Sequence, residues 1–332
     1  MDTSPTPTQH PADADAEKLE VVALHPSGDA IIVIFGPGGA ECHGRFLVSS
    51  ATLSLASSYF RTLFGPNFKE GADLRKSICP EIALEEDWPE EMGILLSMLH
   101  FHNLHHFRDV EPKTVALIAY QRDKYDCAAA IIPWGFKWFH GTGQLTDEQF
   151  GYLLTAAYLL DSDEDFRAIS GAAIRQMTLY FRAVWDGNEL IDRLPRNIKS
   201  MMEKKSMKAI AEAQETIYEV EWRLQEVVLL REPGFGVHAV KIVNCTADVR
   251  VADYFKALRD EKLWPPSCLT ISQIRERTKL LTQFRRHHCD RGEVCKLKKE
   301  LNALSERVNV VLKDIKGISL ESNRKRKETS TF

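Results

Sequence analysis

Long apolar runs are missing from this sequence. No stretch of about 18 uninterrupted apolar residues occurs, and a helix that crosses a membrane needs roughly that length. Residues 1–18 carry acids and prolines and lack a basic segment followed by an apolar one, so neither a secretory signal nor a mitochondrial transit peptide is expected. We therefore expect a protein of the nucleus or cytoplasm that does not associate with membranes.

The sequence also has few cysteines and no excess of positive charge. The 7 cysteines are odd in number and scattered over 332 residues, which favours buried free thiols over a disulfide framework. The formal net charge of −4 excludes a globally basic nucleic-acid binder. Nucleic acid is therefore not an expected partner, although local basic stretches remain.

Arrangements of catalytic residues are also absent. There is no Gly-x-Ser-x-Gly elbow, and the glycine-rich segment 39–46 lacks the lysine and the hydroxyl residue of a phosphate loop. The neighbouring acids Glu85, Glu86 and Asp87 are typical of a solvated loop. We predict that the protein is not an enzyme and that it has no catalytic residue, no cofactor-binding residue and no cofactor.

The first half of the chain mixes strand and helix patterns. Two β-branched segments around a breaker-rich turn predict a β-hairpin, Asp29–Phe35 with Cys42–Val48. Another short strand is expected around Ile78–Leu84. The expected helices share an apolar residue at every third or fourth position, and they begin at Ser49 or Ser50 (ending at Gly65), at Pro89 and at Pro112.

From about residue 141 the pattern is helical. Thr146–Gln149 and Thr270–Gln273 have the spacing of capping boxes, which mark helix starts. Heptad-like apolar residues recur in 199–231 and again in 294–315, which predicts two long helices. We favour a helical hairpin within one chain over an intermolecular coiled coil or a groove for a partner helix, because both helices are available in the same chain.

These patterns predict an α+β fold, with a small sheet and helices followed by an all-α domain with long heptad-like helices. We expect a disordered leader at residues 1–22, because this segment has few bulky apolar residues. The first domain is expected at 23–140 and the helical domain at 141–320. A basic disordered tail is expected at 321–332.

Two groups of histidine and cysteine residues could bind metal. His100, His102, His105 and His106 cluster at an expected helix end, where a polar terminus is the favoured interpretation. The second group consists of His287, His288, Cys289 and Cys295, and Cys245 or Cys268 is the expected source of a fourth ligand. This group contains the better candidates for a zinc site. Because buried free cysteines are common in helical bundles, we predict no metal site.

Basic residues gather in two places near the C-terminus. An expected helix from Arg275 to Lys299 is basic but interspersed with acids, which favours a solvated coiled-coil face over a nucleic-acid surface. The tail has an unpatterned basic run that serves in other proteins as a nuclear import signal: Arg324, Lys325, Arg326 and Lys327. An import signal and an ordinary solvated tail are equally favoured for this run.

Several motifs follow one another in a fixed order between Asp29 and about Phe139. An acidic residue begins the first strand, and the apolar end of the next strand is followed by a serine pair and a helix. A polar cluster follows a later helix. The residues of these motifs are Asp29, Phe46, Ser49, Ser50, Tyr59, Phe60, Asp123, Lys124 and Tyr125. In this order they resemble the BTB/POZ domain, in particular its large fungal group. The helical part that follows is similar to extensions found after this domain in fungal members.

The resemblance implies a compact, helix-rich module with a small sheet that acts as a protein-interaction adaptor. The implied partners are a second copy of the chain in a homodimer, a cullin ubiquitin-ligase scaffold, or a transcriptional co-regulator. The sequence departs from many relatives at Ser49-Ser50, where they have His-Lys, so Asp29 lacks the lysine partner found there. The alternative function is that of a nuclear DNA-associated regulator, in which zinc organises a basic helical C-terminal domain.

Overall fold

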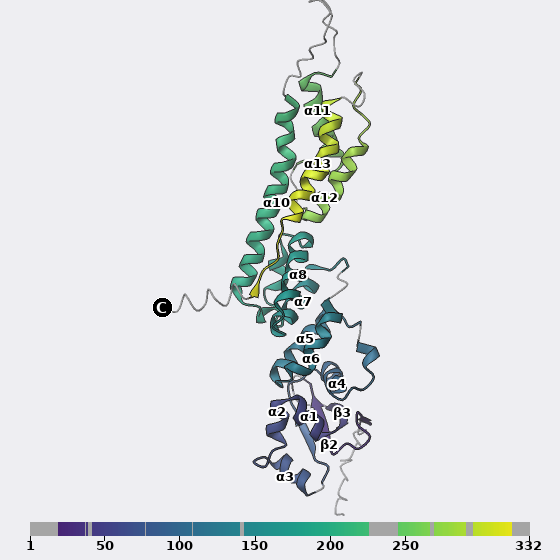
Figure 1. The fold of residues 1–332 in the computed structure, drawn as a ribbon, viewed down its shortest axis with the longest axis vertical. Helices are drawn as coiled ribbons and strands as arrows, with labels where there is room; N and C mark the ends of the chain where they lie inside the picture. The colour runs from purple at the N-terminus through teal and green to yellow at the C-terminus, as the bar shows by residue number, and fades with distance from the viewer. Residues whose placement is uncertain are drawn as a thin grey trace, which may run out of the picture. The chain divides into compact units, whose positions relative to one another are not determined.

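The computed structural model divides into two compact units, which are described separately. The first comprises Met1–Asp109 and Leu117–Pro133, and the second comprises Val110–Ala116 and Trp134–Phe332. The described residues are 19–36, 38, 42–76, 78–107, 109–139, 143–225, 245–265, 269–289 and 295–320. The fold is a mixed α+β fold with one small sheet and many helices, as the sequence predicts (Figure 1).

The first unit contains a four-stranded sheet with the order β1-β3-β2-β4. Its strands are β1 (Val21–Ala23), β2 (Ala30–Phe35), β3 (Cys42–Val48) and β4 (Glu81–Leu84). β2 and β3 form the predicted antiparallel hairpin, while β4 pairs with β2 in parallel and β1 pairs with β3 in parallel. Ile32 and Ile34 on β2 are fully buried, so the central strand supplies much of this unit's core.

The strand β1 begins inside the segment expected as a disordered leader. Val21 lies opposite Arg45 and Val22 opposite Phe46, so the edge of β3 provides backbone partners for this short β-branched segment. The expectation of disorder is therefore wrong for Val21 and Val22. Residues 1–18 lie outside the described part of the chain.

The first unit also contains several short helices. They are α1 (Ser50–Ala56), α2 (Ser58–Leu63), α3 (Lys69–Arg75), α4 (Pro89–Leu99) and the 3₁₀ helix η1 (Leu104–Phe107). Of these, α4 packs against β2 and β3. Two further helices, α5 (Pro112–Lys124) and α6 (Ala128–Phe139), contain residues of both units. Ser49 caps α1 through its hydroxyl, which accepts a hydrogen bond from the amide of Thr52, so the predicted helix start is confirmed.

The single helix predicted from Ser49 to Gly65 is interrupted at Ser57. This residue has an extended backbone, and its hydroxyl caps α2 by accepting a hydrogen bond from the amide of Phe60. The same hydroxyl donates to the carbonyl of Tyr125 at 2.6 Å. The apolar spacing continues through the break, which is why periodicity alone predicts one helix where there are two.

The second unit is helical among the residues described. Its elements are α7 (Asp147–Leu159), α8 (Asp163–Gln176), α9 (Phe181–Trp185), η2 (Ile191–Arg193), α10 (Arg196–Gln225), α11 (Ala247–Asp260), α12 (Ile271–Leu280), η3 (Leu281–Gln283) and α13 (Lys296–Lys313). Both predicted capping boxes are present, at Thr146 with Gln149 and at Thr270 with Gln273. These two helix starts are therefore confirmed.

The two heptad-like helices, α10 and α13, pack against each other within the chain. Their buried positions repeat every three or four residues, at Ala213, Ile217, Val220 and Leu224 on α10 and at Leu297, Leu301, Leu304 and Val308 on α13. Figure 1 shows α10 running beside the shorter helices α11, α12 and α13. The prediction that the heptad helices pair within one chain is confirmed.

The basic helix predicted from Arg275 to Lys299 does not form as one element. α12 ends at Leu280, η3 ends at Gln283, and the next helix begins at Lys296. Phe284 has an extended backbone, and a few residues later the His287 side chain is buried. Tertiary contacts of His287 therefore override the helical propensity of this segment.

No helix among the residues described is both long and apolar enough to cross a membrane.

Candidate functional site

Four side chains from three separate chain segments converge in the second unit, and we call them the Cys₃His cluster: Cys245, His287, Cys289 and Cys295. One ligand atom from each lies within 4.8 Å of all the others. Nε2 of His287 lies 3.5 Å from Sγ of Cys245 and 3.3 Å from Sγ of Cys295, and these two sulfur atoms are 3.9 Å apart. Thiolates and imidazole are zinc ligands, so the cluster could hold one ion.

The cluster is located where helices begin and end. Cys245 directly precedes Thr246, the N-cap of α11, and Cys295 is the N-cap of α13. His287 and Cys289 lie on the non-helical segment after η3. Cys245, Cys295 and His287 are buried, and Cys289 is half-buried, so solvent has little access to the space between them.

Two residues of α11 support the cluster from outside. Oδ2 of Asp253 accepts a hydrogen bond of 2.9 Å from Nδ1 of His287. The buried guanidinium of Arg250 donates to the carbonyl of Cys245 at 2.9 Å and to the carbonyl of Leu224 at 2.7 Å. Arg250 thus joins the last turn of α10 to the segment that carries Cys245.

The proton affinity of the cluster reflects its burial. Burial, with smaller contributions from Cys289 and Cys295, raises the pKa of the Cys245 thiol to about 11. Burial by itself would raise the pKa of Asp253, but hydrogen bonds from Lys256 and His287, together with their charges, hold this pKa below its usual range. Asp253 is therefore the charged partner of His287, while the Cys245 thiol without a bound cation is protonated at neutral pH.

The structure brings together some of the residues that the sequence groups around His287. The candidates Cys289 and Cys295 belong to it, and Cys245 supplies the fourth position that the sequence leaves open between Cys245 and Cys268. His288 does not belong to it, because its side chain is exposed and the adjacent His287 points inward. Cys268 lies outside the described residues.

The four histidines of the first unit do not form such an arrangement. Nε2 of His100 accepts a hydrogen bond from the amide of Ser49, and its Nδ1 lies 2.8 Å from the carbonyl oxygen of Leu96, to which it donates. Phe101 and Asn103 have positive φ angles of 55° and 48°, so the chain turns between His100 and His106. The helical spacing that would bring His102 and His106 to one face is therefore absent.

Asp29, the first motif residue of the first unit, has a partner within the chain. Its carboxylate accepts hydrogen bonds from the amide of Ser50 at 2.7 Å and from the hydroxyl of Ser50 at 2.6 Å. Ser50, the second residue of the Ser49-Ser50 pair, thus binds Asp29 directly. Both oxygen atoms of the Asp29 carboxylate therefore accept a hydrogen bond from Ser50.

Asp87 is buried, and the prediction that it lies in a solvated loop is wrong. It is 0% exposed, and Oδ1 accepts a hydrogen bond of 2.9 Å from Nζ of Lys124 while Oδ2 accepts one from the hydroxyl of Tyr125. Lys124 also donates to the carbonyl of Glu85. Burial, followed by the hydrogen bond to Asp87, raises the pKa of Tyr125 strongly. The sequence does not predict this network, because Lys124 and Tyr125 lie 37 and 38 residues after Asp87.

Tyr125 also joins two groups of motif residues that are distant in sequence: the first half of the motif, from Asp29 to Phe60, and the second half, from Asp123 to Tyr125. Its ring stacks on Phe60 at 5.3 Å between centroids and meets Tyr59 edge-on at 5.1 Å. Its neighbour Asp123, in contrast, is exposed and paired with Arg122. Of the predicted motif residues in this region, Tyr59, Phe60, Lys124 and Tyr125 therefore lie together.

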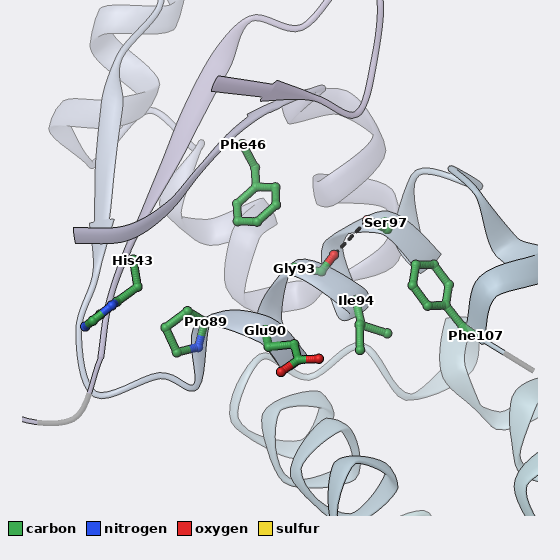
Figure 2. Close-up of a pocket in the computed structure, with 8 residues that line it drawn as sticks. All are labelled: His43, Phe46, Pro89, Glu90, Gly93, Ile94, Ser97 and Phe107. Carbon is green, nitrogen blue, oxygen red and sulfur yellow. Dashed lines mark hydrogen bonds between the residues drawn. The ribbon is translucent and has the colours of Figure 1, made fainter. Parts of the chain in front are cut away.

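A hollow in the first unit lies between β3 and α4 (Figure 2). Its volume is about 560 Å³, and its lining comprises His43, Phe46, Pro89, Glu90, Gly93, Ile94, Ser97 and Phe107. The motif residue Phe46 packs over Gly93, since a Cβ atom at that glycine would lie 2.9 Å from the ring. The hollow is shallow and open, and its lining contains few polar groups that could orient a small molecule.

The basic run at Arg324, Lys325, Arg326 and Lys327 lies outside the described residues.

Comparison with known proteins gave no family assignment: neither the family models nor the curated proteins contain a significant match to this chain.

Proposed function

We propose that this protein is an interaction adaptor whose first unit works as a BTB/POZ module, and that it acts by binding partners and not by catalysis. One observation supports the proposal best. Tyr125, from the second half of the motif, packs on Tyr59 and Phe60 of the first half, and its carbonyl accepts a hydrogen bond from Ser57. Three of the motif residues on which the resemblance rests thus pack together although they are far apart in the sequence.

The proposed partners follow from the resemblance. They are a second copy of the chain, a cullin scaffold of a ubiquitin ligase, or a transcriptional co-regulator, bound in the nucleus or cytoplasm. Two large apolar side chains of the first unit offer positions at which such contacts can be tested, since Leu55 is 82% and Phe101 81% exposed. Single exposed apolar residues are common on protein surfaces, so these two positions are probes and not a defined interface.

The test is light scattering coupled to size exclusion of the full chain, alone and with a fungal cullin homologue. We expect a dimer mass or a stable cullin complex. Leu55→Glu or Phe101→Glu should weaken that association, while Val310→Glu, at a 59% exposed position on α13, serves as the matched control. A monomer that does not bind the cullin would refute both self-association and ligase assembly.

A second candidate is a nuclear DNA-associated regulator, and the Cys₃His cluster favours its zinc-organised part. Arg285 and Arg286 directly precede His287, and Arg286 is exposed. If these arginines contact phosphates, retention of the full chain on duplex DNA should fall steeply with salt and should decrease in Arg285→Glu/Arg286→Glu. Salt-independent or absent retention would exclude this function.

A further inference from the structure

We propose that the Cys₃His cluster is a structural zinc site that closes one end of the helical bundle in the second unit. The proposal is independent of the adaptor function, because it concerns only residues of the second unit. It rests on the distances between the ligand atoms, the orientation of His287, the chemistry of the ligand set and the chain segments that the cluster joins.

The sulfur atoms of Cys245 and Cys295 and Nε2 of His287 have separations close to those that a tetrahedral zinc ion imposes. Bonds of about 2.3 Å to sulfur and about 2.0–2.1 Å to nitrogen place two sulfur ligands about 3.8 Å apart, and sulfur and nitrogen about 3.6 Å apart. The observed separations are 3.9 Å for the sulfur pair and 3.3 Å and 3.5 Å for the two sulfur–nitrogen pairs. The sulfur atoms of Cys245 and Cys295 are also well beyond the bonding distance of about 2.05 Å in a disulfide.

The orientation of His287 is that of a metal ligand. Its Nδ1 donates to Asp253, which leaves the lone pair of Nε2 directed at the sulfur atoms of Cys245 and Cys295. A carboxylate that fixes the tautomer in this way is the usual second partner of a zinc-bound histidine.

The ligand set selects zinc among common ions. Three thiols and one imidazole are soft to intermediate ligands, whereas calcium and magnesium require oxygen ligands. An iron–sulfur cluster needs space for several atoms between its ligands, whereas the four ligand atoms here all lie within 4.8 Å of one another and leave room for a single ion. Four protein ligands fill a tetrahedral shell, so no position is open for substrate and the site is structural.

The proposed ion would connect three segments that are separated in the sequence. Cys245 lies 42 residues before His287, and Cys295 begins α13. Arg250 ties the carbonyl of Cys245 to that of Leu224 at the end of α10. One ion would thus fix the starts of α11 and α13 and the segment after η3 relative to the end of α10, and the Arg250 guanidinium would offset the negative charge of three thiolates around Zn²⁺.

The first experiment is elemental analysis of the full chain purified without chelators. We expect about one zinc per chain, as one closed tetrahedral site requires. His287→Gln and Cys289→Ser should lose most of the zinc. Their matched controls, His288→Gln at the exposed neighbour and Cys79→Ser at an exposed cysteine of the first unit, should keep it. Equal zinc contents in His287→Gln and His288→Gln would overturn the assignment.

A second measurement on the unaltered chain covers the case in which the variants fail to fold. Replacement of zinc by Co²⁺ should give the intense visible bands of a tetrahedral site and the ultraviolet thiolate-to-cobalt bands of three sulfur ligands. A reduced full chain that contains no zinc and gives no such spectrum with added Co²⁺ would refute the proposal. A disulfide between Cys245 and Cys295 in fresh protein, with no metal uptake after reduction, would refute it as well.

The Asp253 carboxylate provides a finer test, because it acts on the metal only through His287. Asp253→Asn should weaken zinc binding by about 10–100-fold, the usual effect of removing such an outer partner. Asp260→Asn is the matched control on the same helix, since Asp260 pairs only with the exposed Arg286 among its described ion pairs. Competition with a chromophoric chelator measures both affinities, and equal values would contradict the proposed role of Asp253.

Discussion

Single buried polar residues hold together parts of the first unit that are distant in sequence. Asp87 joins the segment after β4 to the end of α5 through Lys124 and Tyr125. His100 joins the end of α4 to the start of α1 through Ser49. The sequence does not reveal either link, because a hydrogen bond between residues 37 or 51 positions apart leaves no periodic signal.

Asp87→Ala should destabilise the first unit by about 2–3 kcal/mol, because the Tyr125 hydroxyl and the ammonium of Lys124 both lose their buried acceptor. Tyr125→Phe removes one hydrogen bond and keeps the ring, so a loss of about 1 kcal/mol is expected. Hydrogen exchange of the amides in β2 and β4 measures both effects within this unit. Equal protection in wild type and Asp87→Ala would show that the buried network contributes nothing to stability.

His100 makes the first unit sensitive to acid. Burial, with smaller contributions from His25 and His102, lowers its pKa below 6.5. The unfolded chain therefore binds a proton at a pH where the folded chain does not, and stability falls as the pH decreases below about 6.5. The protection factor of the Ser49 amide should decrease between pH 7.5 and 5.5. In His100→Gln this pH dependence should be lost, and its persistence there would assign the effect to another group.

At the scale of elements, local signals predict helix starts well and helix lengths poorly. Ser49, Thr146 and Thr270 cap helices as expected, because a cap depends on residues within one turn. The breaks at Ser57 and after Gln283 are missed, because they depend on partners elsewhere in the fold, such as Tyr125 for Ser57 and Asp253 for His287.

The segment after α13 illustrates a close approach between elements. A Cβ atom at Gly317 would lie 1.8 Å from the carbonyl oxygen of Arg167 on α8. Near it, the amide of Ile318 donates to the Ser170 hydroxyl at 2.8 Å. Gly317→Ala should therefore detach this segment from α8, which limited proteolysis and hydrogen exchange of α8 would detect.

Gly143→Ala is the matched control for this change, since nothing lies within 4 Å of the position of an added Cβ atom. If both variants leave the exchange of α8 unchanged, the close approach at Gly317 does not restrain the segment.

At the scale of the whole molecule, the two units should respond differently to loss of metal. Chelation of the full chain should speed hydrogen exchange at the starts of α11 and α13, because metal binding to a structural site contributes to folding free energy. The sheet strands β2 and β3 should be unaffected, because the Cys₃His cluster belongs to the second unit. Uniform loss of protection in both units would contradict this separation, and no change in either would contradict a structural role for the ion.

The sequence by itself determined the features that rest on nearest neighbours along the chain: the β2–β3 hairpin, the capped helix starts and the heptad stripes of α10 and α13. Apolar periodicity and capping depend only on residues a few positions apart, so they can be predicted without knowledge of the fold. Only the tertiary structure decided that His287 and not His288 turns inward, and that Cys245 completes the cluster. Two adjacent histidines are equivalent in sequence, and a ligand 42 residues away becomes a neighbour only when α11 and α13 pack.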